Sequence, residues 1–106
     1  MEEFCQVIIS ATSKDEANKI SDLLVKNKLI AGSLIIKGES RYWWQEKIVE
    51  KDYYNLQAFS LIKNKEKIIS EVKKIHTDKC PIIAFLKIDG NKEFLNWIKS
   101  SINKEV

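Results

Sequence analysis

The hydrophobic residues of this 106-residue chain recur at two spacings, and each spacing predicts one kind of element. Alternating apolar positions, or a short unbroken apolar run, are typical of strands, whereas apolar residues three and four apart are typical of helices. Predicted strands cover residues 4–10, 31–37, 48–59 and 82–88, and predicted helices cover residues 13–27, 61–76 and 91–102. Because the run 82–88 is apolar at nearly every position, we expect that strand to be central and covered on both faces.

Short polar signals place the helix starts. Thr12 or Ser13 can cap the first helix, and Ser13 with Glu16 three residues later fits a capping box. Ser60 is the candidate N-cap of the second helix.

Three further signals shape the connections. Gly38 predicts a bend or bulge in the second strand, which then extends through the residues beyond it. The chain is expected to reverse at residues 45–47, although these include no glycine. Residues 76–81 are expected to form a loop, because Pro81 disfavours a helical conformation at the residue before it.

The order strand, helix, strand, strand, helix, strand, helix is that of the split β-α-β, or ferredoxin-like, arrangement with one added C-terminal helix. We therefore predict one α+β domain over residues 1–106, with an antiparallel sheet and a long hairpin between its second and third strands. A chain of this length can bury a core without disulfides.

The hairpin carries adjacent aromatic residues at Tyr42, Trp43 and Trp44. In a strand Tyr42 and Trp44 share one face and Trp43 takes the other. One face can pack on the domain's own core, whereas the other needs a second surface. We therefore expect Tyr42 to Trp44, with Tyr54 on the returning strand, to form an interface with another chain. The alternative is that these residues, together with Tyr53, form an aromatic cage for a ligand.

Composition excludes several classes. The net charge is +3 and acidic residues are mixed among the lysines, so no nucleic-acid partner is expected. No apolar run approaches the length of a membrane span, so we expect no direct membrane insertion. The start Met1-Glu2-Glu3 is unlike a signal peptide, and two cysteines are too few for a disulfide framework. These features predict a cytoplasmic location.

The candidate metal-binding residues lie close in sequence to the single histidine. His76, Asp78 and Cys80 combine three types of metal ligand that one loop could fold around copper or another divalent cation. Their spacing matches no known zinc pattern. The alternatives are that His76 caps the preceding helix and that Cys80 is a small buried hydrophobe. The chain has no catalytic triad order, nucleophile elbow or glycine-rich phosphate loop, so we expect no enzyme.

Several segments, in their order and spacing, resemble one family from about Val7 to Ile102. They are Leu29-Ile30-Ala31, Tyr42-Trp43-Trp44, Lys74-Ile75-His76 with Pro81, Leu86-Lys87-Ile88, Gly90-Asn91 and Phe94-Leu95-Asn96-Trp97-Ile98. These segments resemble the CutA family, the divalent-cation-tolerance proteins. The resemblance implies a ferredoxin-like fold and a homotrimer whose long hairpins pair with those of neighbouring subunits. It also implies a response to metal ions, with copper binding in some members.

The chain departs from the family pattern at the usual candidates for copper binding. Gly32 and Ala11 stand where the family frequently has cysteine, and Thr77-Asp78-Lys79 stands where it has Pro-Tyr-Glu. The resemblance therefore carries no copper ligand over to these positions.

Two hypotheses of function follow. The first is a non-catalytic homotrimer that holds a divalent metal or small anionic ligand at clefts between subunits. Its candidate cleft or interface residues are Tyr42, Trp43, Trp44, Tyr54 and Lys87, beside the metal candidates His76, Asp78 and Cys80. The alternative is a scaffold or anchoring trimer for a protein partner, which needs no ligand site.

Overall fold

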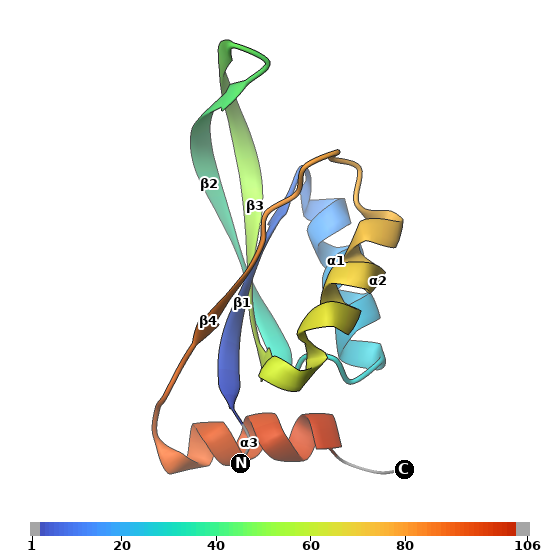
Figure 1. Ribbon diagram of the computed structural model, residues 1–106, viewed down its shortest axis with the longest axis vertical. Helices are drawn as coiled ribbons and strands as arrows, with labels where there is room; N and C mark the ends of the chain where they lie inside the picture. The colour runs from blue at the N-terminus through green and yellow to red at the C-terminus, as the bar shows by residue number, and fades with distance from the viewer. Residues whose placement is uncertain (1–2, 104–106) are drawn as a thin grey trace.

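A computed structural model describes residues 3–103 as one four-stranded antiparallel sheet with three helices (Figure 1). The elements are β1 (Phe4–Ala11), α1 (Lys14–Lys26), β2 (Gly32–Trp44), β3 (Lys47–Leu61), a 3₁₀ turn η1 (Ile62–Asn64), α2 (Lys65–Ile75), β4 (Ile83–Lys87) and α3 (Lys92–Asn103). The strand order is β2-β3-β1-β4. The predicted α+β, ferredoxin-like architecture is confirmed.

The main core lies between the sheet and the layer formed by α1 and α2. Strand β1 alternates as expected, with Val7 and Ile9 fully buried against Ile20 and Leu24 of α1 and residues of α2. Each such side chain contributes about 1.5–3 kcal/mol through burial of apolar area. This core therefore fixes which face of the sheet the two helices cover.

A second core lies under α3, which crosses the end of the molecule opposite the hairpin tip (Figure 1). Ile98 and Ile102 of α3 pack with Leu61, while Phe59 and Phe94 meet edge to face with centroids 5.2 Å apart. The helix predicted at residues 91–102 is confirmed, and its apolar residues face this core. Because α3 covers only one end of the sheet, most of the face opposite α1 and α2 is not covered by any part of residues 3–103.

Strands β2 and β3 pair without interruption, from Gly32 opposite Phe59 to Trp44 opposite Lys47. Gly38 lies opposite Tyr53 within this register, so the predicted bulge is wrong. An extra residue here would move every later side chain to the other face, and would separate residues that now share a face. The hairpin continues beyond the rest of the sheet, and the molecule reaches 45 Å along its longest axis.

The hairpin reverses at Gln45 and Glu46, inside the predicted segment. Their φ angles are 50° and 68°, and the flanking residues Trp44 and Lys47 are already paired. Two positive φ angles identify a type I′ turn, whose twist matches the strands but which glycine and asparagine adopt far more readily.

Two predictions were wrong: the central place of the fourth strand and the N-cap at Ser60. Strand β4, which was predicted to be central, lies at the edge of the sheet, because β1 is flanked by β3 and β4 and no strand of residues 3–103 pairs beyond β4. Its residues Ile83 and Phe85 reach the main core, whereas Leu86 is exposed. Ser60 is not an N-cap: it is fully buried in β3, where its hydroxyl donates to the Leu29 carbonyl. Helix α2 begins at Lys65, after the η1 turn.

We predict that replacing Gln45-Glu46 with Asn-Gly raises the free energy of unfolding by about 1 kcal/mol, because these residues tolerate positive φ. Chemical denaturation measures the change. Glu46→Ala is the matched control, since it removes the same charge but keeps the unfavourable backbone. An equal gain from the control would show that charge, and not backbone geometry, limits the turn.

Candidate functional site

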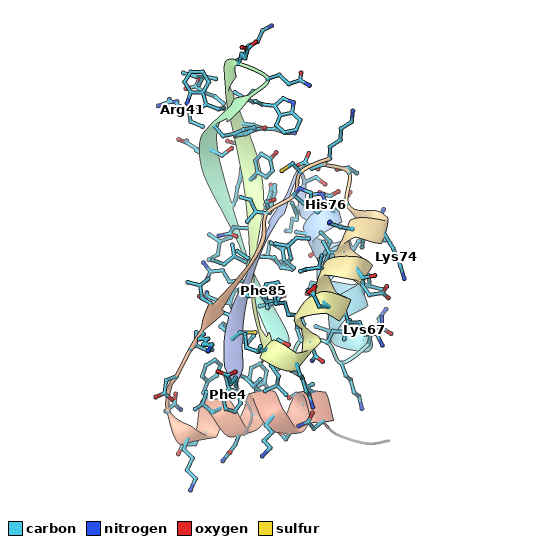
Figure 2. The ribbon with its side chains drawn as sticks, viewed as in Figure 1. Phe4, Arg41, Lys67, Lys74, His76 and Phe85 are labelled. Carbon is cyan, nitrogen blue, oxygen red and sulfur yellow. The ribbon has the colours of Figure 1, made fainter. Side chains whose placement is uncertain are left out.

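His76 follows α2 and joins the loop to the end of β1. Its side chain is 1% exposed, its Nε2 lies 2.5 Å from the Ser10 carbonyl oxygen, and its Nδ1 accepts from the Asp78 backbone N–H at 3.0 Å. Because Nδ1 accepts, the ring proton lies on Nε2 and is donated to Ser10. Figure 2 shows His76 inside the bend of the loop, between the sheet and the helices. Both ring nitrogens are therefore used within the chain.

Glu16, in the first turn of α1, is the charged centre of the same region. Its side chain is 7% exposed. One carboxylate oxygen accepts from the Thr12 backbone and hydroxyl at 2.9 and 3.1 Å, and the other from the Thr77 backbone and hydroxyl at 2.9 and 2.7 Å. Burial acts to raise the pKa of Glu16, but these bonds and the nearby His76 ring outweigh it and lower the pKa to about 2.

The predicted capping box is only half formed. The Ser13 hydroxyl accepts from the Glu16 backbone N–H at 3.1 Å, which confirms Ser13 as the N-cap. The Glu16 carboxylate, however, bonds Thr12 in place of the Ser13 backbone, and also bonds Thr77 across the structure. Glu16 thus ties the start of α1 to the loop after α2.

On the other side of the loop, Asp78 meets the hairpin. The Tyr53 hydroxyl donates to Asp78 Oδ2 at 3.0 Å, and the Tyr42 hydroxyl lies 3.3 Å from that of Tyr53. The two tyrosine rings meet edge to face, with centroids 6.0 Å apart. Burial, followed by the bonds to Tyr42 and Asp78, raises the pKa of Tyr53, so its hydroxyl stays a donor.

These contacts frame a cleft of about 280 Å³ between the hairpin and the loop. It is lined by Tyr42, Trp44, Gln45, Tyr53, Thr77, Asp78, Lys79 and Cys80. The walls are aromatic, while the loop presents one carboxylate, one ammonium group and one thiol. Such a mixture of apolar walls with a few fixed polar groups is typical of a small-molecule site.

The structure brings together only some of the predicted metal ligands. Asp78 and Cys80 line the cleft, whereas His76 lies behind the loop with both nitrogens engaged. Among residues 3–103 no group of three His, Cys, Asp or Glu side chains is placed to hold a metal ion. The donors of one chain therefore do not fit a metal site by themselves. Cys80 is exposed, so the alternative of a buried hydrophobe at that position was wrong.

The other predicted residues separate into different places. Tyr54 packs against the main core of its own chain, and Lys87 forms an exposed ion pair with Glu3 at 2.9 Å, away from the residues that line the cleft. Trp43 is 72% exposed and points to the face opposite Tyr42. Tyr42, Trp44 and Tyr53 line the cleft with Asp78, whereas Trp43 lines only the adjoining hollow along the hairpin.

Sequence reasoning named Tyr53 only for an aromatic cage and Thr77 only as part of the loop, and it did not predict that their contacts hold the loop in place. Tyr53 and Thr77 lie far from their partners Asp78 and Glu16 along the chain, and no spacing rule links them. The one available signal was the Ser13–Glu16 pair, which correctly marked Glu16 as a side chain that bonds backbone N–H groups.

A large apolar surface remains on the sheet face opposite α1 and α2. Leu34, Ile36, Ile82 and Leu86 are 55%, 47%, 56% and 46% exposed. The pairing places Leu34 in one row with Gln57, Ile8 and Ala84, so the surface crosses all four strands. An uncovered apolar area of this kind marks an interaction site.

Residues 5–101 match the model of the CutA1 divalent ion tolerance protein family. The chain belongs to this family. The divalent-cation tolerance protein CutA of Archaeoglobus fulgidus is 31% identical over 97 residues, covering 91% of this chain and 95% of the relative. The divalent-cation tolerance protein CutA of Pyrococcus horikoshii is 27% identical over 105 residues, covering 92% of this chain and 99% of that relative.

Solved CutA structures share the fold. The A. fulgidus protein, described as periplasmic, has a TM-score of 0.90 at 31% identity, covering 97% of this chain and 100% of that one. The Thermus thermophilus protein has a TM-score of 0.84 at 33% identity, covering 92% and 95%. CutA1 of Oryza sativa has a TM-score of 0.91 at 24% identity, covering 97% and 96%, which supports the fold alone. No helix within residues 3–103 is long and apolar enough to cross a membrane.

We predict that Glu16→Gln lowers the free energy of unfolding at neutral pH by roughly 2 kcal/mol, because the amide NH₂ would face the N–H donors of Thr12 or Thr77. The folded-state pKa of about 2 lies below the ordinary value of 4.5. The contribution of Glu16 is therefore complete above pH 4.5 and is lost as the pH falls toward 2.

Denaturant titrations at pH 7 and across this acidic range test the prediction. The unfolding free energy of the unmodified chain should fall more steeply with acid than that of Glu16→Gln. Glu66→Gln, at an exposed position of α2, is the matched control and should change little at neutral pH. Parallel acid profiles for the unmodified chain and Glu16→Gln would contradict the assignment.

Proposed function

We propose that this CutA family member is a non-catalytic homotrimer that holds a small ligand at the cleft between the hairpin and the loop 76–82. The observation that carries the proposal is the meeting of two features in one region. Asp78 and Cys80 face the aromatic side chains of Tyr42 and Trp44, and the hairpin that carries those aromatics extends beyond the chain's own sheet.

The uncovered sheet supports association between copies of the chain. The edges of β2 and β4 have no pairing partner within the described residues, and Leu34, Ile36 and Leu86 lie exposed between them. Unpaired edges and apolar faces favour association, and a closed ring removes them without leaving open ends. The trimer that the family resemblance implies satisfies both requirements.

The ligand follows from the donors of the cleft. Asp78 and Cys80 supply two of the ligand types that divalent cations use, so a metal ion here needs further ligands from a neighbouring subunit. A small anionic ligand would meet Lys79 and the Tyr42 hydroxyl instead. Both ligand classes use the same walls, and both place the ligand where subunits would meet.

Isothermal titration calorimetry with copper(II), zinc(II) and inorganic phosphate tests the ligand half of the proposal. We expect saturable binding of at least one of them, weakened about tenfold or more by Asp78→Asn combined with Cys80→Ser. Asp15→Asn on α1 is the control for the change of charge. Flat titrations with all three, or an equal loss in the control, would contradict a ligand site in this cleft.

Leu34→Lys tests the assembly half. We expect it to shift the chain toward a monomer, because a buried charge at the centre of an apolar interface costs several kcal/mol. Light scattering after size-exclusion chromatography gives the mass. Val25→Lys is the matched control, since Val25 is 41% exposed but lies on α1. Assembly that survives Leu34→Lys and fails with Val25→Lys would place the interface elsewhere.

The scaffold alternative rests on a separate observation. Trp43 and Ile48 lie opposite each other near the hairpin tip, and both are more than half exposed. A scaffold would still bind its protein partner in the Asp78→Asn, Cys80→Ser variant and would lose it when the trimer is disrupted. If binding of the partner depended on the ligand, the partner would be lost in both cases. The cytoplasmic location stays a prediction from cysteine content, since the A. fulgidus relative is described as periplasmic.

A further inference from the structure

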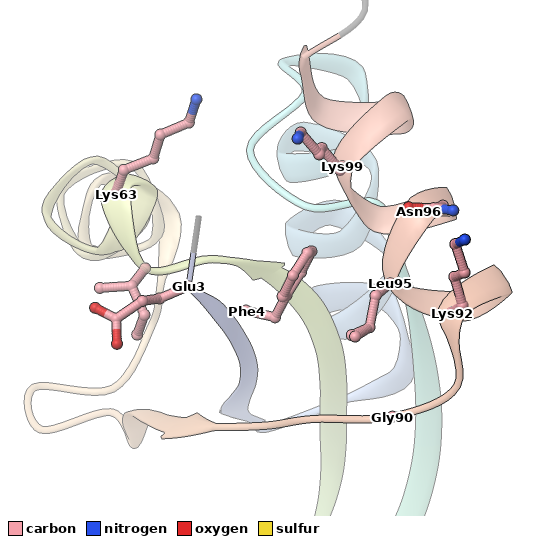
Figure 3. A pocket seen from close by; sticks show the side chains of 9 residues that line it. Glu3, Phe4, Lys63, Gly90, Lys92, Leu95, Asn96 and Lys99 are labelled. Atoms are coloured by element: carbon pink, nitrogen blue, oxygen red, sulfur yellow. The ribbon is translucent and has the colours of Figure 1, made fainter. Parts of the chain in front are cut away.

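A second hollow lies at the opposite end of the molecule from the cleft. It measures about 980 Å³ and is lined by Glu3, Phe4, Ile62, Lys63, Gly90, Lys92, Leu95, Asn96 and Lys99. Figure 3 shows Phe4 and Leu95 between the Lys63 side and the α3 side of this hollow. Its floor is therefore apolar, and lysines stand on both of its walls.

The α3 wall follows directly from helix geometry. Lys92, Leu95, Asn96 and Lys99 are spaced three and four residues apart, so they form one stripe along the helix. Lys92 and Lys99 are two turns apart, about 10 Å along the axis, with Leu95 and Asn96 between them. The helix thus presents two ammonium groups and an amide beside an apolar side chain.

Among residues 3–103 the hollow is lined by one carboxylate, that of Glu3, which does not balance its three lysines. Glu3 is already paired with Lys87, at 2.9 Å. Within residues 3–103 neither Lys92 nor Lys99 forms an ion pair. On the opposite wall, the Lys63 ammonium donates to the Asn103 side chain at 2.9 Å, which fixes it toward α3. The walls therefore carry a net positive charge.

We infer that this hollow binds a small amphipathic anion, an apolar chain or ring that carries a carboxylate or phosphate group. Phe4, Ile62 and Leu95 bury the apolar part, and Lys92 and Lys99 bind the anionic group through charge-assisted hydrogen bonds. The size of the hollow falls within the range of small-molecule sites. The site is separate from the cleft of the proposed function and does not depend on it.

Isothermal titration calorimetry of the full chain with decanoate, decyl phosphate and decanol, below their micelle concentrations, tests this inference. Decanoate or decyl phosphate should bind and decanol should not. The tighter of the two anions identifies the head group. Raising NaCl from about 0.1 M to about 0.5 M should weaken binding, since the lysines are exposed and salt screens them.

The decisive variant is Lys92→Gln with Lys99→Gln, which should weaken binding of the anion about tenfold or more. Lys14→Gln with Lys19→Gln on α1 makes the same change of charge and should leave affinity within about twofold. Asp78→Asn with Cys80→Ser should also leave it unchanged, which separates this site from the cleft. Absence of binding, equal binding of decanol, or an equal loss in the α1 control would overturn the inference.

Discussion

The unbroken pairing of β2 with β3 is the constraint on which the rest of the structure depends. Because no residue is inserted at Gly38, alternation holds along the whole hairpin. It runs from the pair of Leu56, which is fully buried, and Ile35, which is partly buried against the core, to the exposed pair of Trp43 and Ile48. The same alternation turns Tyr53 and Tyr42 toward the loop after α2. A slip of one residue would exchange the two faces and remove the cleft.

The loop that completes the cleft is fixed by buried polar contacts and not by apolar packing. The Glu16 carboxylate accepts a hydrogen bond from the Thr77 backbone, and the His76 ring accepts one from the Asp78 backbone. On the other side of the loop, the Tyr53 hydroxyl donates to the Asp78 carboxylate. A buried carboxylate that accepts four hydrogen bonds is stabilising only while every bond is made. The loop is therefore preorganised, so a ligand that binds there would meet little cost of ordering it.

The sequence predicted most of the fold because the signals for it are local. Alternation along β1 and the helical stripes of α1 and α3 each identified their elements, and Ser13 identified a helix start. The errors came from features that only tertiary contacts decide. Strand β4 is apolar on both faces, but its place at the sheet edge depends on strand order. Ser60 resembles an N-cap, but its hydroxyl is used by the Leu29 carbonyl.

The candidate site was predicted less completely, for the same reason. Residues near one another in sequence, such as Asp78 and Cys80, were identified together and do share the cleft. Tyr53 was named as a cage candidate, but its contact with Asp78 was not predicted, because that contact arises only when the hairpin folds over the loop. Lys87 and Tyr54 were assigned to the cleft by residue type, and their positions in the sheet direct them elsewhere.

Sedimentation equilibrium of the unmodified chain, over a range of concentrations and with and without copper, tests the central claim most directly. That claim is that the uncovered sheet face and the projecting hairpin belong to a closed assembly of three copies. The account predicts three times the chain mass of 12.3 kDa in both conditions. A monomer in both conditions would contradict it, because the exposed apolar face and the aromatic hairpin would then have no partner of their own kind.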